Sequence, residues 1–102
     1  MRTPIEPEQF RATHGLGDWQ VDADAASIAF TTPDFSSGAR FALEVAAIAD
    51  ELDHHPDLDL RYGSVMIRTS THSTGGLTEL DVALAERVTE LAASHGFAPA
   101  AD

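Results

Sequence analysis

Three of the chain's five histidines lie within one short segment, residues 50–72, which reads "DELDHHPDLDLRYGSVMIRTSTH". His54 and His55 are adjacent and stand directly before Pro56, and His72 closes the segment. Histidine has an unperturbed pKa of about 6.5, so its imidazole can donate or accept a proton near neutral pH. Two imidazoles held close together also disfavour each other's charge, which lets one act as acid and the other as base. The segment therefore predicts proton-transfer chemistry, provided that the fold brings the histidines together.

The residues between the histidines predict how the fold does this. The stretches "DLDLRY" and "VMIRTSTH" alternate with period two and are separated by Gly63-Ser64, which is typical of a β-hairpin with a two-residue loop. In that register Tyr62 pairs with Val65, and His55 falls opposite His72. Directly opposed residues have Cβ atoms roughly 5 Å apart. The hairpin is thus expected to gather all three imidazoles at its open end, with His54 beside the other two.

The same register makes two further predictions. Asp59 faces Arg68 on the polar side, as an exposed cross-strand ion pair worth only tenths of a kcal/mol. Leu60 faces Ile67 on the opposite side, which is expected to point toward the core. The residues assigned to this core side are Leu58, Leu60, Tyr62 and Ile67.

The polar residues allow three other interpretations. The histidines could simply be polar residues at a helix–strand junction. A metal site is not expected, because adjacent residues in an extended chain point to opposite sides and no HxH or HExxH spacing is present. A hydrolase triad is also disfavoured, because no nucleophile elbow is visible. The hydroxyls near His72 would then be substrate hydrogen-bonders or ordinary strand residues, and the isolated His14 and His95 would be surface or helix-capping residues.

Periodicity and capping signals predict the helices and strands that position these residues. In the clearest helix, Asp34 can cap the N-terminus, the apolar residues recur every three or four positions, and Pro56 forces the chain to leave the helix. The order α-β-β-α-β-β-α predicts an α+β fold, with a four-stranded antiparallel sheet and three helices packed on one face, as a single domain over residues 1–102. The expected helices cover residues 4–13, 34–53 and 79–94, and the expected strands cover 19–22, 26–32, 57–62 and 65–72.

The last helix carries its own start signal. Thr78 is the expected N-cap, and Asp81 lies three residues on, as a shortened capping box. Leu84, Val88 and Leu91 mark the side expected to be buried. The chain beyond Gly96 is expected to be loose.

Composition restricts the partners. Six basic residues against seventeen acidic ones give a formal charge of −11, which disfavours direct binding to nucleic acid or to anionic membranes. The absence of cysteine removes thiolate chemistry and disulfides. No stretch has the character of a signal peptide or a membrane helix, so a cytoplasmic location is expected.

Two stretches, "ELDHHPDLDLRY" and "RTSTHSTGGLTELDVALA", together resemble the signature of the pterin-4a-carbinolamine dehydratases. The shared pattern is a carboxylate, a histidine pair before proline, a tyrosine in the hairpin, a Thr-His pair, and Gly-Leu-Thr-x-x-Asp at the start of the last helix. Upstream, the strand around Trp19, the stretch "IAFTTPDF" and the helix at 34–53 fit the same layout. The resemblance thus spans most of the chain.

The resemblance implies a small-molecule substrate, 4a-hydroxytetrahydropterin, which members dehydrate to the quinonoid dihydropterin in support of aromatic amino acid hydroxylases. Loss of the 4a-hydroxyl needs an acid at the departing oxygen and a base at N5, and neither a metal nor a cofactor is implied. By position, His55 matches the family's acid–base histidine, His72 its hairpin-end partner, and His54 the neighbour that binds or stabilises the pterin. The implied substrate-binding residues are Asp53, Ser70, Thr71, Ser73 and Asp81; for Asp81, helix capping is an equal alternative.

Two departures from the family pattern keep a second function open. Leu58 stands where relatives often carry tryptophan, and Leu80 stands where some carry a basic residue. The alternative is a non-catalytic binding or assembly module that retains the fold, for which the alanine-rich helix at 34–53 is a possible contact surface. A homodimer or homotetramer is expected in either case, because a four-stranded antiparallel sheet has exposed edges.

Overall fold

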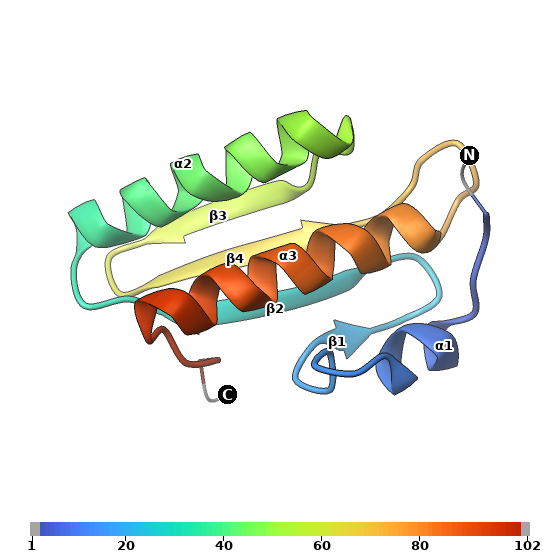
Figure 1. Cartoon of the computed structure of the whole chain (residues 1–102), viewed down its shortest axis with the longest axis horizontal. Coiled ribbons are helices and arrows are strands. Elements are labelled where there is room, and N and C mark those ends of the chain that lie inside the picture. The colour runs from blue at the N-terminus through green and yellow to red at the C-terminus, as the bar shows by residue number, and fades with distance from the viewer. Residues whose placement is uncertain (1–2, 101–102) are drawn as a thin grey trace.

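The structure is a computed structural model that describes residues 3–100. It confirms the predicted order of elements and the α+β fold (Figure 1). The elements are α1 (Pro7–Ala12), β1 (Gln20–Val21), β2 (Ala26–Thr31), α2 (Phe35–Leu52), β3 (Asp57–Arg61), β4 (Ser64–Thr69) and α3 (Glu79–His95).

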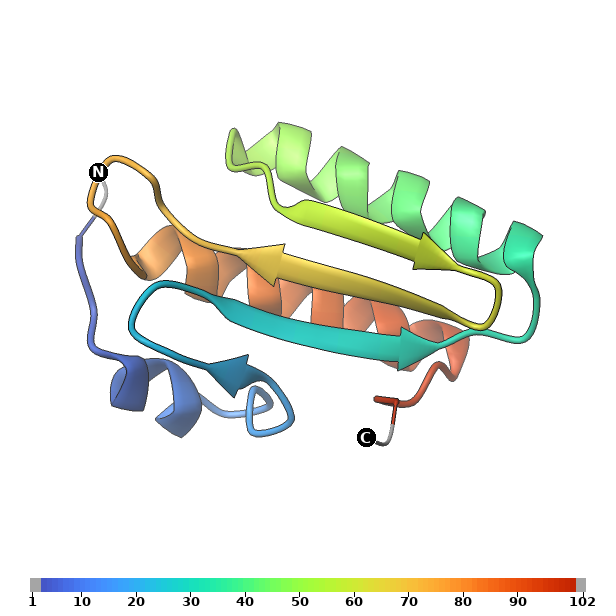
Figure 2. The same ribbon diagram turned by 180° about the vertical axis from the view of Figure 1, so that it is seen from behind.

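The four strands form one antiparallel sheet in the order β1-β2-β4-β3. The long helices α2 and α3 lie side by side on one face of this sheet, and α1 packs beside β1. Seen from behind, the opposite face of the sheet carries no helix (Figure 2). The core between sheet and helices is apolar, and its largest fully buried hydrophobic side chains are Phe10, Leu16, Phe30, Phe41, Val45, Val65, Ile67, Leu84 and Val88.

The start of α2 follows the sequence prediction. The Asp34 carboxylate accepts a hydrogen bond from the backbone N–H of Ser37 (2.7 Å), and this contact lowers the pKa of Asp34. The predicted stripe is buried at Phe41, Val45 and Ile48. The helix expected at residues 4–13 is shorter than predicted: α1 begins only at Pro7.

The predicted register of the β3–β4 hairpin is wrong by two positions. Arg61 pairs with Ser64, so the two-residue loop is Tyr62-Gly63, and the predicted pairing of Tyr62 with Val65 does not form. Neither loop residue has a positive φ, so the turn does not exploit the conformational freedom of glycine. Instead the Gly63 carbonyl accepts a hydrogen bond from the backbone N–H of Thr32 (3.0 Å). This contact ties the loop to the segment between β2 and α2.

The shifted register changes the polar pairs. Asp57, not Asp59, lies opposite Arg68, while Asp59 lies opposite Met66, so the predicted Asp59–Arg68 ion pair is wrong. Asp59 instead contacts Arg61 on its own strand (2.9 Å). Hydrogen bonding from that guanidinium lowers the pKa of Asp59.

The core side of the hairpin is only partly as predicted. Ile67 is fully buried and Leu60 packs against the core, but Leu60 faces Val65 rather than Ile67. Tyr62 is 77% exposed because it lies in the loop, and Leu58 is 37% exposed. Both were expected to point into the core. The prediction is wrong for Tyr62, and Leu58 shares the side of Ile67 but is exposed and does not join the core cluster.

The ends of the last helix give one confirmation and one correction. Thr78 caps α3, and Leu84 and Val88 are buried while Leu91 is partly buried. The chain that follows is not loose within the described residues: the backbone N–H of Thr31 donates to the Ala98 carbonyl (2.9 Å), and that of Ala100 donates to the Ala29 carbonyl (2.7 Å). Residues 97–100 therefore extend along the edge of β2. Residues 101 and 102, also expected to be loose, lie outside the described part of the chain.

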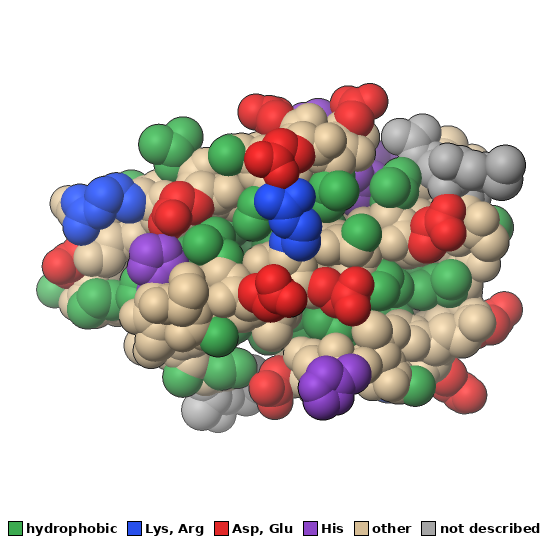
Figure 3. All heavy atoms as spheres, in the orientation of Figure 1, with side chains coloured by type: hydrophobic (Ala, Val, Ile, Leu, Met, Phe, Trp, Pro, Cys, Tyr) green, Lys and Arg blue, Asp and Glu red, His purple; other side chains and the backbone are tan. Residues whose placement is uncertain are grey.

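Acidic side chains are spread over the helix-bearing face, with few basic ones among them (Figure 3). One of these acids, Glu51 on α2, contacts Arg87 on α3 (2.7 Å) and so links the two helices. Within residues 3–100, no helix is both long enough and apolar enough to cross a membrane.

Candidate active site

The end of α2 sets the directions of the two adjacent histidines. Asp53 adopts the left-handed conformation (φ 50°), and the backbone N–H of His54 reaches back to the Ala49 carbonyl (3.0 Å). This pattern terminates helices, but the left-handed conformation is unfavourable for residues other than glycine. Pro56 then keeps His55 out of the helical conformation. The chain therefore leaves the helix abruptly, with His54 buried and His55 exposed.

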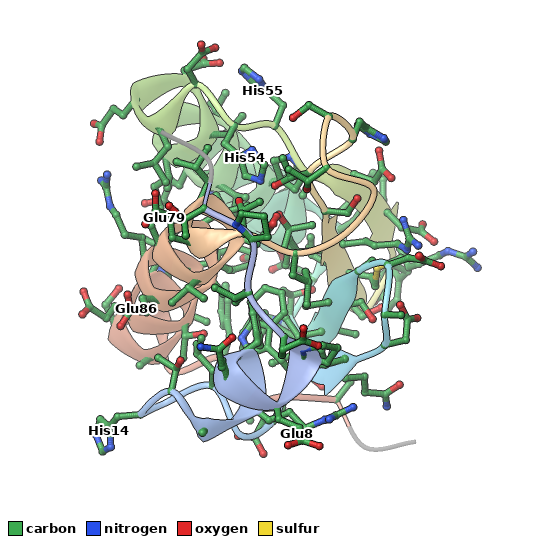
Figure 4. All side chains as sticks on the ribbon, turned by 90° about the vertical axis from the view of Figure 1, so that its right-hand side faces the viewer. Glu8, His14, His54, His55, Glu79 and Glu86 are labelled. Atoms are coloured by element: carbon green, nitrogen blue, oxygen red, sulfur yellow. The ribbon has the colours of Figure 1, made fainter. Side chains whose placement is uncertain are left out.

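His54 points into the molecule and is held by a buried carboxylate. Its Nε2 lies 2.7 Å from Oδ1 of Asp81, with His54 only 6% and Asp81 0% exposed. Figure 4 shows the His54 ring directed toward the interior and the His55 ring directed away from it. The contact joins the end of α2 to the first turn of α3, two segments far apart in the sequence.

Asp81 is surrounded by groups that can donate hydrogen bonds. The Thr69 hydroxyl donates to Oδ1 (2.5 Å), while the Thr71 hydroxyl (2.7 Å) and the backbone N–H of Thr78 (2.8 Å) donate to Oδ2. An ionised carboxylate only accepts hydrogen bonds, so this set of partners suits that form. The His54 Nε2 must then carry the hydrogen that it shares with Asp81, and in the neutral tautomer with this hydrogen Nδ1 is the nitrogen that can accept a hydrogen bond.

Asp81 is the capping residue that was expected, and it also contacts a histidine of the candidate site. It completes the capping box of α3 with Thr78, and it holds the His54 ring. A carboxylate in the first turn of a helix is also favoured by the helix dipole. The start of α3 and the orientation of His54 therefore depend on one side chain.

The third histidine lies on a tight turn after β4. The backbone N–H of Thr71 donates to the Gly76 carbonyl (2.8 Å), and Gly75 takes a positive φ of 72° at the corner. His72 and Ser73 lie on this turn and are exposed. The turn thus presents both side chains to solvent beside the end of α2.

The histidines line one hollow of about 410 Å³, a size suited to a small ligand. Every predicted site residue except Asp81 borders it, and Asp81 lies beneath, in contact with His54. The lining residues are Asp53, His54, His55, Ser70, Thr71, His72 and Ser73.

The predicted direct opposition of His55 and His72 is wrong. Continued beyond the strands, the observed register places His55 opposite Ser70, two positions short of His72. A displacement of two positions preserves the alternation of faces, so His55 and His72 still border the same hollow. They border it together without being a directly facing pair.

His55 has an aspartate partner of its own. Its Nε2 lies 3.0 Å from Oδ1 of Asp50, with side chains 59% and 75% exposed. Within residues 3–100, no group of three or more His, Cys, Asp or Glu side chains is placed to hold a metal ion.

The volume of the histidine hollow does not distinguish it from other hollows of the protein. A second hollow of about 430 Å³ lies where β1 and residues 97–100 run along the edge of β2. Its lining includes Gln20, Ile28, Met66 and Pro99. Among the described residues that line that hollow there is no histidine, and the only acid is Asp18. The convergence of titratable side chains, rather than size, identifies the candidate site.

Sequence reasoning missed two threonines of the site. Thr69 had no predicted role, and Thr78 was predicted only as a helix cap, but the hydroxyl of Thr69 and the backbone N–H of Thr78 both donate to Asp81. A signal for Thr69 was present: it continues the buried alternation of Val65 and Ile67, so a polar side chain falls on an apolar face. A polar group in such a place needs a partner.

Comparisons with known proteins point in one direction. Residues 3–91 match the model of the family described as pterin 4 alpha carbinolamine dehydratase. A Streptomyces avermitilis protein is 43% identical over 98 residues (91% of this chain, 97% of that protein), and a Metallosphaera sedula protein is 41% identical over 81 residues (79% and 84%). Both are provisionally described as pterin-4-alpha-carbinolamine dehydratases.

Two solved structures are similar. A Brucella melitensis protein described as a transcriptional coactivator/pterin dehydratase superposes with a TM-score of 0.77 at 34% identity, covering 88% of this chain and 98% of that one. A pterin dehydratase-like protein described as a RuBisCO assembly factor of the alpha-carboxysome has a TM-score of 0.62 at 23% identity, covering 78% and 94%. The second likeness concerns the fold alone.

Proposed function

Because this chain belongs to the pterin-4a-carbinolamine dehydratase family, we propose that it dehydrates a 4a-hydroxytetrahydropterin to the quinonoid dihydropterin. The observation that carries the proposal is the convergence of His54, His55 and His72 on one hollow large enough for a small ligand. The substrate loses its 4a-hydroxyl as water, and N5 loses its proton as the N5–C4a double bond forms. The reaction therefore needs one proton donor and one proton acceptor, which two imidazoles can supply.

We assign the proton transfers to the exposed pair. His55 and His72 border the hollow and are in contact with solvent, so their protons can be exchanged between turnovers. In the proposed mechanism one protonates the departing hydroxyl while the other accepts the proton from N5. His54 binds the pterin ring, because its Nδ1 remains available to accept a hydrogen bond while Nε2 is held by Asp81.

The remaining predicted residues have different proposed parts. Asp53, Ser70 and Ser73 border the hollow, and we propose that they hydrogen-bond to the substrate. The Thr71 hydroxyl donates to Asp81 and also contacts the Thr78 hydroxyl (2.9 Å), so its part is to hold the site together. No step of the proposed reaction uses a metal or a cofactor.

The test is the decay of a 4a-carbinolamine with His55→Ala and His72→Ala. If proton transfer is the main contribution, each substitution lowers the enzymatic rate by about 10²–10⁴-fold. The matched control is His14→Ala, because His14 is exposed and lies at the opposite end of the molecule from His54 and His55 (Figure 4). Wild-type rates in both site variants would overturn the mechanism.

An assembly role is the second candidate. Its supporting observations are two exposed apolar side chains on α2, Leu43 (72%) and Phe35 (50%), and the assembly function described for the carboxysomal structural neighbour. This role is favoured if the wild-type protein has no dehydratase activity and a specific partner is lost on Leu43→Ser. Light scattering would test the predicted homodimer or homotetramer.

A further inference from the structure

One arginine beside the candidate site has a guanidinium group with no hydrogen-bond or ion-pair partner among the described residues. The chain has no lysine, so its six basic residues are all arginines. Among the five within residues 3–100, four make a hydrogen bond or an ion pair, whereas Arg68 makes neither with any described residue. The four that do are Arg11, Arg40, Arg61 and Arg87.

Arg68 borders a small recess that continues the histidine hollow. The recess is lined by His55, Asp57, Arg68, Ser70 and His72, three of which also line the main hollow. Arg68 and Ser70 lie on the same face of the β4 ribbon, and two residues of a strand span roughly 7 Å. The guanidinium is therefore placed at the rim of the hollow, on the side of β3 and β4.

Two acids lie near Arg68 without pairing with it. Asp57 is its cross-strand partner in β3, but no ion pair joins their side chains. The pKa of Asp22 is lowered mainly by hydrogen bonds from the backbone N–H groups of Asp24 and Ala25, and to a smaller extent by the charge of Arg68. The N–H donors of the Arg68 guanidinium are therefore not used by either acid. Their planar, paired arrangement suits the oxygens of a carboxylate or a phosphate.

We propose that Arg68 selects pterins whose C6 side chain carries an anionic group, either a carboxylate or a phosphate. This inference rests on the proposed function, because the pterin ring must occupy the histidine hollow for its side chain to run along β4 toward Arg68. In a protein with a formal charge of −11, anions are repelled from most of the surface. An unpartnered arginine at the rim supplies a local attraction that a neutral side chain cannot use.

The test compares three fluorescent probes that share the ring: 6-hydroxymethylpterin, its phosphate ester and pterin-6-carboxylate. Dissociation constants are measured by fluorescence titration of the wild-type protein, Arg68→Gln and the control Arg61→Gln. Arg61 is the matched control, because it is an exposed arginine of the same hairpin whose guanidinium is already paired with Asp59. The anionic probes should bind the wild-type protein about five-fold more tightly than the neutral one.

Arg68→Gln should remove this preference and leave the affinity for 6-hydroxymethylpterin unchanged, whereas Arg61→Gln should retain it. The preference should also weaken at high salt. Whichever anionic probe binds more tightly identifies the favoured group. Equal binding of the three probes, or a preference that survives Arg68→Gln, overturns the inference but not the dehydratase, provided that wild-type protein still accelerates carbinolamine decay. If no probe binds and decay is not accelerated, both proposals fail.

Discussion

His54 and His55 are neighbours in sequence, and each contacts an aspartate through Nε2, but the two pairs lie in opposite surroundings. The His54–Asp81 pair is almost completely buried, and three further donors surround the carboxylate. The His55–Asp50 pair is more than half exposed and has no such support. The same two residue types therefore form a rigid contact in one case and a solvent-exposed one in the other.

The difference is consistent with the separate roles proposed for the two histidines. A buried and fully hydrogen-bonded pair fixes the position of a ring, because any movement would leave a polar group without a partner. An exposed histidine is less constrained but can exchange protons with water. The proposed proton transfer needs both properties. The end of α2 provides them in adjacent residues, because His54 is buried and His55 is exposed.

The largest effect is expected from Asp81→Ala. The substitution leaves the buried His54 and three donors without their acceptor, and it also removes the capping carboxylate of α3. We expect the free energy of unfolding to fall by about 3–5 kcal/mol, measured by urea denaturation. A loss below about 1 kcal/mol would mean that the buried pair does not differ from the exposed one.

A smaller effect is expected from Thr71→Val, which keeps the shape but deletes the hydroxyl between Asp81 and Thr78. The loss of one donor to a buried carboxylate should lower the free energy of unfolding by about 1–3 kcal/mol. Ser73→Ala, on the exposed turn, is the matched control and should be neutral. If both variants unfold at the same urea concentration, the network around Asp81 is not a source of stability.

Asp53 ends α2 in the left-handed conformation, and the chain then places His54 in the interior and His55 at the surface. Asp53→Gly accepts that conformation without strain, whereas Asp53→Ala does not. We expect the glycine variant to be more stable than the alanine variant by about 1 kcal/mol, by thermal or urea denaturation. Asp53→Asn, which tolerates the conformation but lacks the charge, should bind pterin more weakly if the carboxylate contacts the ligand. The reverse order of stability for Gly and Ala would contradict the backbone assignment.

The smallest effect is expected from Asp50→Asn. Exposed ion pairs contribute little, so the free energy of unfolding should change by less than about 0.5 kcal/mol. The same denaturation series as for Asp81→Ala provides the measurement. A change as large as that of the buried pair would remove the contrast between the two histidines.

Local signals in the sequence predicted most of what is local in the structure. Asp34 and Thr78 cap their helices as expected, because a cap depends on residues within one turn. The alternation of the strands predicted which residues share a face, so the predicted site residues were brought together although the register was displaced.

The errors concern contacts between distant segments. The hairpin loop is fixed by the Gly63–Thr32 backbone contact, and no property of residues 62–65 encodes it. The ordering of residues 97–100 depends on β2, which lies far upstream. The alternation of β4 indicated that Thr69 needs a buried partner, but the identity of that partner, Asp81 on α3, depends on how α3 packs against β4.

The hydrogen bonds between residues 97–100 and the edge of β2 also bear on synthesis of the chain. On the ribosome, β2 emerges early, whereas the segment that satisfies its outer backbone groups from Ala29 to Thr31 emerges only after α2, the β3–β4 hairpin and α3. Until residues 97–100 have emerged, that edge of the nascent sheet remains open to pairing with other polypeptides.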